Sequence, residues 1–186
     1  DRVQWDWIDA AAEASRHAGA PNVVADARGQ ADEIRSVALE VAGLPRSRPI
    51  SAASLIVQRR SAMAMDGATA MSLDRFVGLL RRLMPGAGPP FDTFPWTPRI
   101  HLVLFVHRVD GLQPGLYALP RTNAGAELLH GALNPDFAWV APPGVPDDVP
   151  LVLLDHADCR SIARQLSCGQ DIAADGVLSL AMLARF

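Results

Sequence analysis

The clearest hydrophobic pattern of the chain lies between residues 72 and 83. Apolar residues in this stretch recur at the i, i+3, i+4, i+7 spacing of one helix face: Leu73, Phe76, Val77, Leu80 and Leu83. Ser72 is a residue type that caps helix N-termini, and Pro85-Gly86 cannot continue a helix. The pattern therefore predicts an amphipathic helix that begins after Ser72 and ends before Pro85.

Further along the chain, short runs of aliphatic and aromatic residues are typical of strands. They are residues 100–109, 115–119, 151–154 and 177–183. Asp110-Gly111 supplies turn residues between the first two runs, which predicts a hairpin or a near-hairpin. The last run is interpreted as strand-like.

Three more segments favour helices. Ile34, Val37, Ala38 and Val41 share one helical face of residues 29–42, and Gly43 is placed to end that helix. Residues 54–60 are expected to form a short helix that ends in an arginine pair, and Asp155 or Asp158 can cap a helix that carries Ile162, Ala163 and Leu166. Because helices and strands are mixed without regular βαβ alternation, the predicted class is α+β.

Proline-rich segments divide the chain. Residues 44–49 are expected to link an N-terminal helical segment, residues 1–49, to a domain over residues 50–186. Five prolines and two glycines prevent regular structure over residues 85–98, where Phe91, Phe94 and Trp96 are expected to pack on something. The chain begins with Asp1 and stops inside an apolar run at Phe186, so it is interpreted as a fragment of a longer protein.

The composition excludes several classes. Of the 186 residues, 49% are hydrophobic and 20% are charged, which is typical of a folded globular protein rather than a disordered one. The net charge of −3 gives no general attraction to nucleic acid. No apolar run approaches the ~18 residues of a membrane span, and no signal-peptide core is present, so a cytoplasmic protein is expected.

The cysteines and histidines do not form a metal-binding pattern. The sequence has no second cysteine pair besides Cys159 and Cys168, and no histidine stands at metal-ligand spacing from them. Both cysteines are expected to be buried thiols. His101, His107 and His130 are scattered, and we interpret them as edge residues or as hydrogen-bonded residues. No metal is therefore predicted.

Arg59, Arg60 and Ser61 carry the strongest candidate chemistry. Two guanidiniums and a hydroxyl, with nearby backbone amides, can bind a phosphate monoester through charge-assisted hydrogen bonds. The same residues also fit a solvated helix end, where cations offset the negative end of the helix dipole. The residues alone leave both interpretations open.

The order of these motifs resembles the nitroreductase superfamily over residues 51–186. The matching features are RRSA followed by MDG, a helix ending LLRRLMP, a proline and aromatic loop, HLVLFVHRVDGL, PGLYAL and SCGQDIAADGVLSLAMLARF. The resemblance is greatest to the branch that contains the azoline-oxidising, thiazole- and oxazole-forming dehydrogenases. It implies an α+β fold with a mixed or antiparallel sheet flanked by helices, of which the C-terminal part lies beyond Phe186.

The same resemblance implies flavin mononucleotide (FMN) as cofactor, held between two protomers. Arg59 and Ser61 match the positions that contact the phosphate and the ribityl chain, and Arg60 matches the neighbouring basic or polar position. Phe91 and Trp96 lie where the family's loop approaches the flavin ring, although Phe91 replaces a serine. Met63 stands where the family has a further cation.

The expected function is an FMN-dependent oxidoreductase that moves hydride from NAD(P)H through the flavin to a small or peptide-derived substrate. We expect a homodimer, or a pseudo-dimer with an upstream homologous domain, and no nucleic-acid or membrane partner. No catalytic side chain is assigned, and Tyr117 is expected to pack in the core. Alternatives are a flavin-free domain that acts as a dimerisation or scaffold partner, and a domain that binds flavin or a haem-degradation product without turnover.

Overall fold

The computed structural model describes residues 13, 51–86, 88, 90–94 and 96–184. Within these residues the chain forms five α-helices, one 3-10 helix and a four-stranded sheet. In chain order they are α3 (Ala52–Gln58), α4 (Leu73–Leu83), η1 (Phe91–Thr93), β1 (Ile100–Val106), β2 (Gly115–Leu119), α5 (Asn123–Ala132), β3 (Val152–Asp155), α6 (Arg160–Leu166), α7 (Ile172–Asp175) and β4 (Leu178–Ala184). The fold is α+β, as expected.

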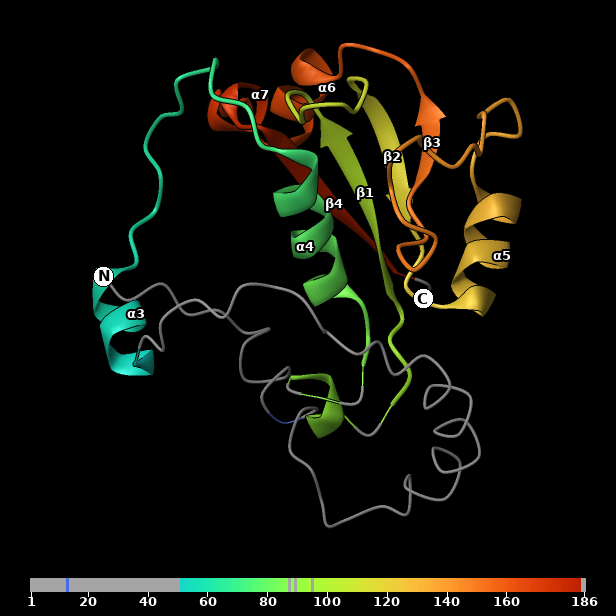
Figure 1. Ribbon diagram of the computed structural model, residues 1–186, viewed down its shortest axis with the longest axis horizontal. Coiled ribbons are helices and arrows are strands. Elements are labelled where there is room, and N and C mark those ends of the chain that lie inside the picture. The colour runs from blue at the N-terminus through green and yellow to red at the C-terminus, as the bar shows by residue number, and fades with distance from the viewer. Residues whose placement is uncertain (1–12, 14–50, 87, 89, 95, 185–186) are drawn as a thin grey trace.

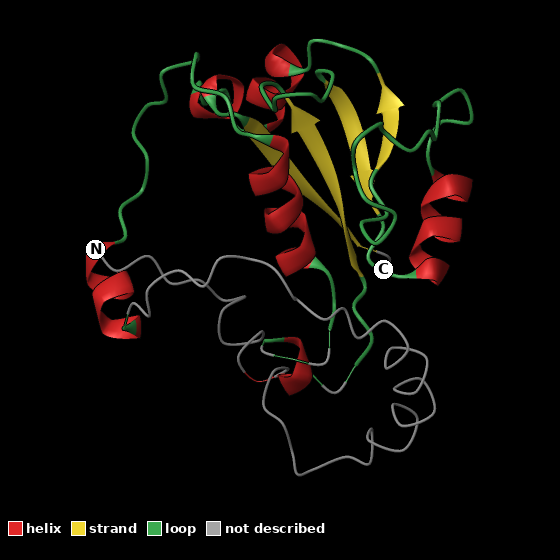
Figure 2. Ribbon diagram, viewed as in Figure 1, coloured by secondary structure: helices red, strands yellow, loops and turns green. Residues whose placement is uncertain are grey.

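The sheet is antiparallel throughout, with strand order β3-β2-β1-β4 (Figure 2). β1 is central and pairs with β2, with Leu104 opposite Tyr117, and with β4, with Leu104 opposite Leu180. The predicted β1–β2 hairpin is therefore confirmed. The one parallel contact among the described residues is a single bridge between Met71 and Val109, outside the named strands.

Helix α4 covers one face of the sheet (Figure 1). Every second residue of β1 points to this face, because side chains alternate along a strand. The buried members of this core include Phe76, Val77, Leu80, Leu102, Leu104, Val106, Tyr117 and Leu119. Tyr117 is in the core as predicted, and burial raises its pKa to about 12 while its hydroxyl donates to the Gln113 carbonyl at 2.6 Å.

The opposite face of β1 contacts the helices near the C-terminal end. Val103 and Phe105 pack here with Cys159, Ala163 and Ala173 from the segments that form α6 and α7. At the other end of β1, His101 lies against Gly125 of α5, where an added Cβ would lie 1.9 Å from the imidazole Cε1. The sheet therefore has helices on both faces.

Most predicted elements form close to their expected bounds. Helix α4 starts after Ser72 and ends at Leu83, and the strands at residues 115–119 and 151–154 are each within a residue of β2 and β3. The N-cap of α6 is Cys159 rather than Asp155 or Asp158, although the Asp158 Oδ1 atom does accept from the Arg160 amide at 3.1 Å. Helices α5 and α7 were not predicted.

Some sequence-based predictions were wrong. The helix expected at residues 54–60 starts at Ala52 and ends at Gln58, so the arginine pair follows it. The predicted irregular loop after α4 contains the short helix η1, and Cys168 is exposed whereas Cys159 is buried. The helix predicted at residues 29–42 and the linker at 44–49 lie outside the described residues. No helix in the described part of the chain is long and apolar enough to cross a membrane.

Candidate functional site

The residues predicted to bind FMN phosphate lie on an arm, defined here as residues 51–70, that stands apart from the sheet body (Figure 1). Ser51 begins its helix α3, because the Ser51 hydroxyl oxygen accepts from the Ser54 amide at 3.1 Å. None of the α3 side chains is buried. Beyond Gln58 the backbone of Arg59 leaves the helical region, with φ −59° and ψ 132°.

Arg59, Arg60 and Ser61 are all exposed. The Arg60 Nη1 atom donates to the carbonyl of Val57 at 2.7 Å and to that of Arg59 at 2.9 Å, so this side chain satisfies acceptors at the helix end. The side chains of Arg59 and Ser61 make no hydrogen bond to another described residue. The helix-end interpretation therefore fits Arg60, and the anion-binding interpretation fits Arg59 and Ser61.

The arm is anchored to the body at its C-terminal end, where the MDG motif forms a turn. The Asp66 carboxylate accepts from the amides of Ala68 and Thr69 at 2.9 and 2.8 Å and from the Thr69 hydroxyl. The Thr69 hydrogen bonds are the main reason that the pKa of Asp66 falls to about 2. Gly67 adopts φ +67°, a left-handed conformation that favours glycine.

The body side of this anchor is Arg108, two residues after the end of β1. Its Nε donates to the Thr69 carbonyl at 3.1 Å, and its Nη2 donates to the carbonyls of Asp175 and Gly176. One guanidinium thus joins the arm to the turn that follows α7. Arm residues beyond this anchor, including Arg59, depend on another surface for any enclosed site.

The aromatic residues predicted to contact the flavin ring lie on the loop around η1. Phe91 lies under the Arg121 guanidinium, whose Cζ is 5.1 Å from the ring centroid. Trp96 is exposed and its ring lies 5.7 Å from that of Phe94, tilted by 44°. Among the described residues no hydrogen bond or ring contact connects these aromatics with the arm, so one chain does not gather the five predicted residues into one pocket.

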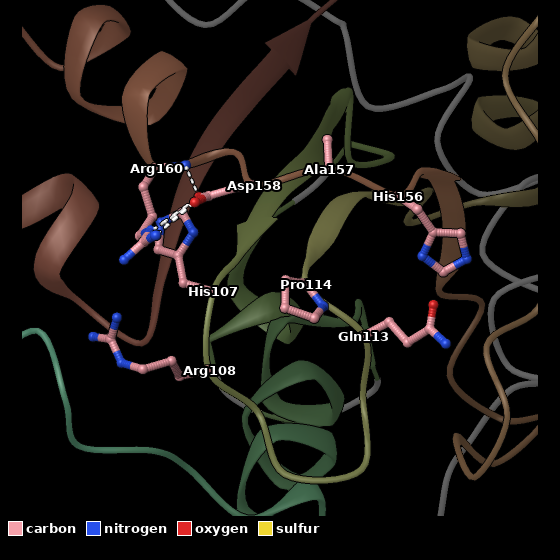
Figure 3. A pocket seen from close by; sticks show the side chains of 8 residues that line it. All are labelled: His107, Arg108, Gln113, Pro114, His156, Ala157, Asp158 and Arg160. Atoms are coloured by element: carbon pink, nitrogen blue, oxygen red, sulfur yellow. Dashed lines mark hydrogen bonds and ion pairs between the residues drawn. The ribbon is translucent and has the colours of Figure 1, made fainter.

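A pocket of about 560 Å³ lies elsewhere, at the end of the sheet where β1 finishes (Figure 3). Its walls come from the turn before β2, through Gln113 and Pro114, and from the segment that joins β3 to α6, through His156 and Asp158. His107 also lines it. Sequence reasoning did not identify this site, because its residues come from three separated segments.

His101, within β1, and His107, directly after it, are neither at a sheet edge nor equivalent. The His101 Nδ1 atom accepts from the Arg121 amide at 3.0 Å, as expected for a hydrogen-bonded histidine. The His107 Nε2 atom is bonded to the Ala173 carbonyl at 3.0 Å, but its buried Nδ1 has no hydrogen-bond partner. Burial lowers the pKa of both imidazoles. No group of three metal-ligating side chains occurs in the part of the chain that the structure describes.

Comparisons with known proteins add no family: no family model, no curated protein and no solved structure matches this chain.

Proposed function

We propose that this chain is a nitroreductase-like, FMN-dependent oxidoreductase in which the flavin lies between the arm of one unit and the body of a second, related unit. One observation carries the proposal: the arm presents Arg59 and Ser61 without hydrogen-bond partners in the described chain, beside exposed apolar side chains. Those side chains are Leu55, Ile56, Val57, Met63 and Met65. A flat apolar ring needs burial on both faces, which a projecting arm supplies only when a second surface covers it.

The residues on the arm fit the phosphate end of the cofactor. Arg59 offers a planar fork of donors, and the Ser61 hydroxyl adds one more, which suits a phosphate monoester. Arg60 is engaged with the helix end and contributes positive charge rather than its Nη1 donors. When bound, FMN supplies two-electron transfer between NAD(P)H and a small or peptide-derived substrate, while the protein supplies binding and orientation.

A second candidate is a flavin-free domain that serves as a dimerisation or scaffold partner. It is favoured by Met63, which is 93% exposed and stands where the resemblance implies a cation. A thioether cannot neutralise a phosphate, so this substitution removes charge from the proposed site. In this case the exposed arm makes only a protein contact.

The visible spectrum of the purified protein, with and without added FMN, separates the candidates. Bands at about 375 and 450 nm that bleach with a reduced nicotinamide support the oxidoreductase. A bound flavin that does not bleach indicates a binding domain without turnover. A colourless protein that does not take up FMN indicates the scaffold.

Replacing Arg59 tests the residue assignment. Arg59→Ala should weaken FMN binding by about 1.5–3 kcal/mol, the range for a hydrogen bond to a charged group. The measurement is a fluorescence titration of FMN into the wild type and the variant. Arg75→Ala removes an exposed arginine from α4 and serves as the control, which should bind FMN like the wild type. Equal affinities of the Arg59 variant and the wild type would count against the assignment.

A further inference from the structure

The pocket at the end of β1 is separate from the proposed flavin site and uses none of its residues. Its volume of about 560 Å³ lies within the range of pockets that bind small molecules. Figure 3 shows the His107 ring close to Asp158 and Arg160, with Gln113 and His156 across the pocket from it. Polar groups therefore face the space from two sides.

His107 is the buried polar group of this pocket. The residue is only 6% exposed. Because a carbonyl oxygen can only accept, the 3.0 Å contact with Ala173 places the ring proton on Nε2. Nδ1 then carries the lone pair, and it has no hydrogen-bond partner among the described residues. A buried acceptor without a partner costs about 1–3 kcal/mol, so a ligand that donates a hydrogen bond here recovers part of that cost.

The protonation state of His107 fits this role. Burial is the largest cause of its lowered pKa, and the nearby cations Arg108 and Arg160 lower it further, against an opposing effect of Asp158 and of the Ala173 hydrogen bond. The imidazole is therefore neutral at pH 7, with Nδ1 as an acceptor. The ligand atom that meets it must carry a hydrogen, as a hydroxyl does.

Two guanidiniums at the pocket wall can hold an anion. Arg108 and Arg160 bring two positive charges, which Asp158 on the wall and Asp175, a neighbour of Arg160, balance with two negative charges. Asp158 is held by Arg160 through Nε at 2.9 Å and Nη2 at 2.5 Å, and it also accepts from the Arg160 amide. The Nη1 groups of both arginines have no partner among the described residues. The two guanidiniums thus keep free Nη1 donors at the pocket.

We propose that this pocket binds a small hydroxycarboxylate, whose hydroxyl donates to His107 Nδ1 and whose carboxylate accepts from the free Nη1 donors of Arg108 and Arg160. The ligand thus needs two independent groups. Its hydroxyl is the donor for the buried His107 Nδ1 acceptor, and its carboxylate is the anion for the two arginines. A plain carboxylate satisfies only the second requirement. A neutral alcohol satisfies only the first.

Calorimetric titration of the FMN-free protein with malate and with succinate tests the hydroxyl. The two dianions have the same carbon chain, and only malate carries a hydroxyl. Malate should bind about fivefold more tightly, as one added hydrogen bond predicts. Equal affinities, or no detectable binding of either compound, would overturn the proposal. Because no flavin is present, failure of the proposed flavin chemistry does not affect this result.

Matched variants assign the contacts. His107→Leu removes both ring nitrogens and with them the Nδ1 acceptor, so malate and succinate should bind it equally. Arg160→Gln should weaken both compounds by about threefold. Arg164→Gln changes an exposed α6 arginine that does not line the pocket, and both affinities should stay at the wild-type values. A malate preference that survives in folded His107→Leu would contradict the assignment.

A measurement on the wild type covers the case in which the histidine variant does not fold. Malate should shift the ¹⁵N resonance of His107 Nδ1, because that nitrogen gains a hydrogen-bond donor, whereas succinate should leave it nearly unchanged. An Nδ1 resonance that responds to neither compound, or equally to both, would overturn the proposal.

Discussion

The arm and the sheet body contain helices of similarly apolar sequence with opposite surroundings. In α4, Phe76, Val77 and Leu80 are buried against β1. In α3, Leu55, Ile56 and Val57 are all exposed. Both helices follow a serine, so the difference is not one of helix initiation.

The difference is one of spacing. Apolar residues of α4 are separated by three and four positions and therefore share one face, whereas three consecutive residues of α3 are about 100° apart around the helix. A single flat surface covers the first arrangement and only part of the second. A seven-residue helix is also marginal in water without packing, and none of the α3 side chains is buried.

The largest expected difference between the two helices is in how much the free energy of unfolding falls when one apolar residue of each is truncated. Phe76→Ala should lower the free energy of unfolding by about 3–5 kcal/mol, because Phe76 is fully buried and its loss leaves a cavity. Ile56→Ala should change the same quantity by less than about 0.5 kcal/mol in the monomer, because Ile56 is 75% exposed. Urea unfolding at low protein concentration measures both.

A large loss of monomer stability in Ile56→Ala would show that the arm packs on its own body. If Ile56→Ala lowers stability only at high protein concentration, the surface that packs on α3 belongs to another molecule. That result would strengthen the difference between α3 and α4.

Two glycines of α5 should show how closely the body is packed. Gly125→Ala should destabilise the protein by about 1–3 kcal/mol, because the new Cβ would lie 1.9 Å from the His101 ring. Gly131→Ala in the same helix meets nothing within 4 Å and should stabilise by up to about 1 kcal/mol through helix propensity. Thermal unfolding of both variants checks the pair, and equal melting temperatures would contradict the close contact of α5 with His101.

The smallest expected effect is a loss of stability in mild acid, which should come from the body rather than from the arm. His101 and His107 have lowered pKa values in the folded protein, so the unfolded chain takes up protons first as the pH falls below about 6.5. Their contribution is complete above that pH and is lost as the pH falls toward the folded values. Urea midpoints at pH 7.5 and 5.5 measure the effect.

The variant His107→Gln should reduce this pH dependence, since one of the two buried imidazoles is removed. The arm carboxylate Asp66 adds no pH dependence in this range, because its unfolded pKa of 3.8 and its folded pKa of about 2 both lie below it. A pH dependence that is unchanged in the variant would show that His107 is not a cause of it.

Much of the body follows from local sequence rules. Period-3.6 spacing defined α4, alternating runs with a turn defined the β1–β2 hairpin, and the mixture of the two gave the α+β class. Helix α5 was missed because its sequence, NAGAELLHGA, contains two glycines and only a weak apolar stripe. Thr122 does cap it, since the Thr122 hydroxyl oxygen accepts from the Gly125 amide at 3.0 Å.

The sequence by itself determined the four strands, the helices α4 and α6, and which residues of α4 and β1 are apolar enough for a core, because these depend on neighbours a few residues apart. Only the tertiary structure decided that Arg59 and Ser61 stand on an exposed arm, and that His107 shares a pocket with Asp158 and Arg160. Those outcomes depend on strand order and on which face of β1 each side chain takes. Such contacts join positions some fifty residues apart, and no local pattern encodes them.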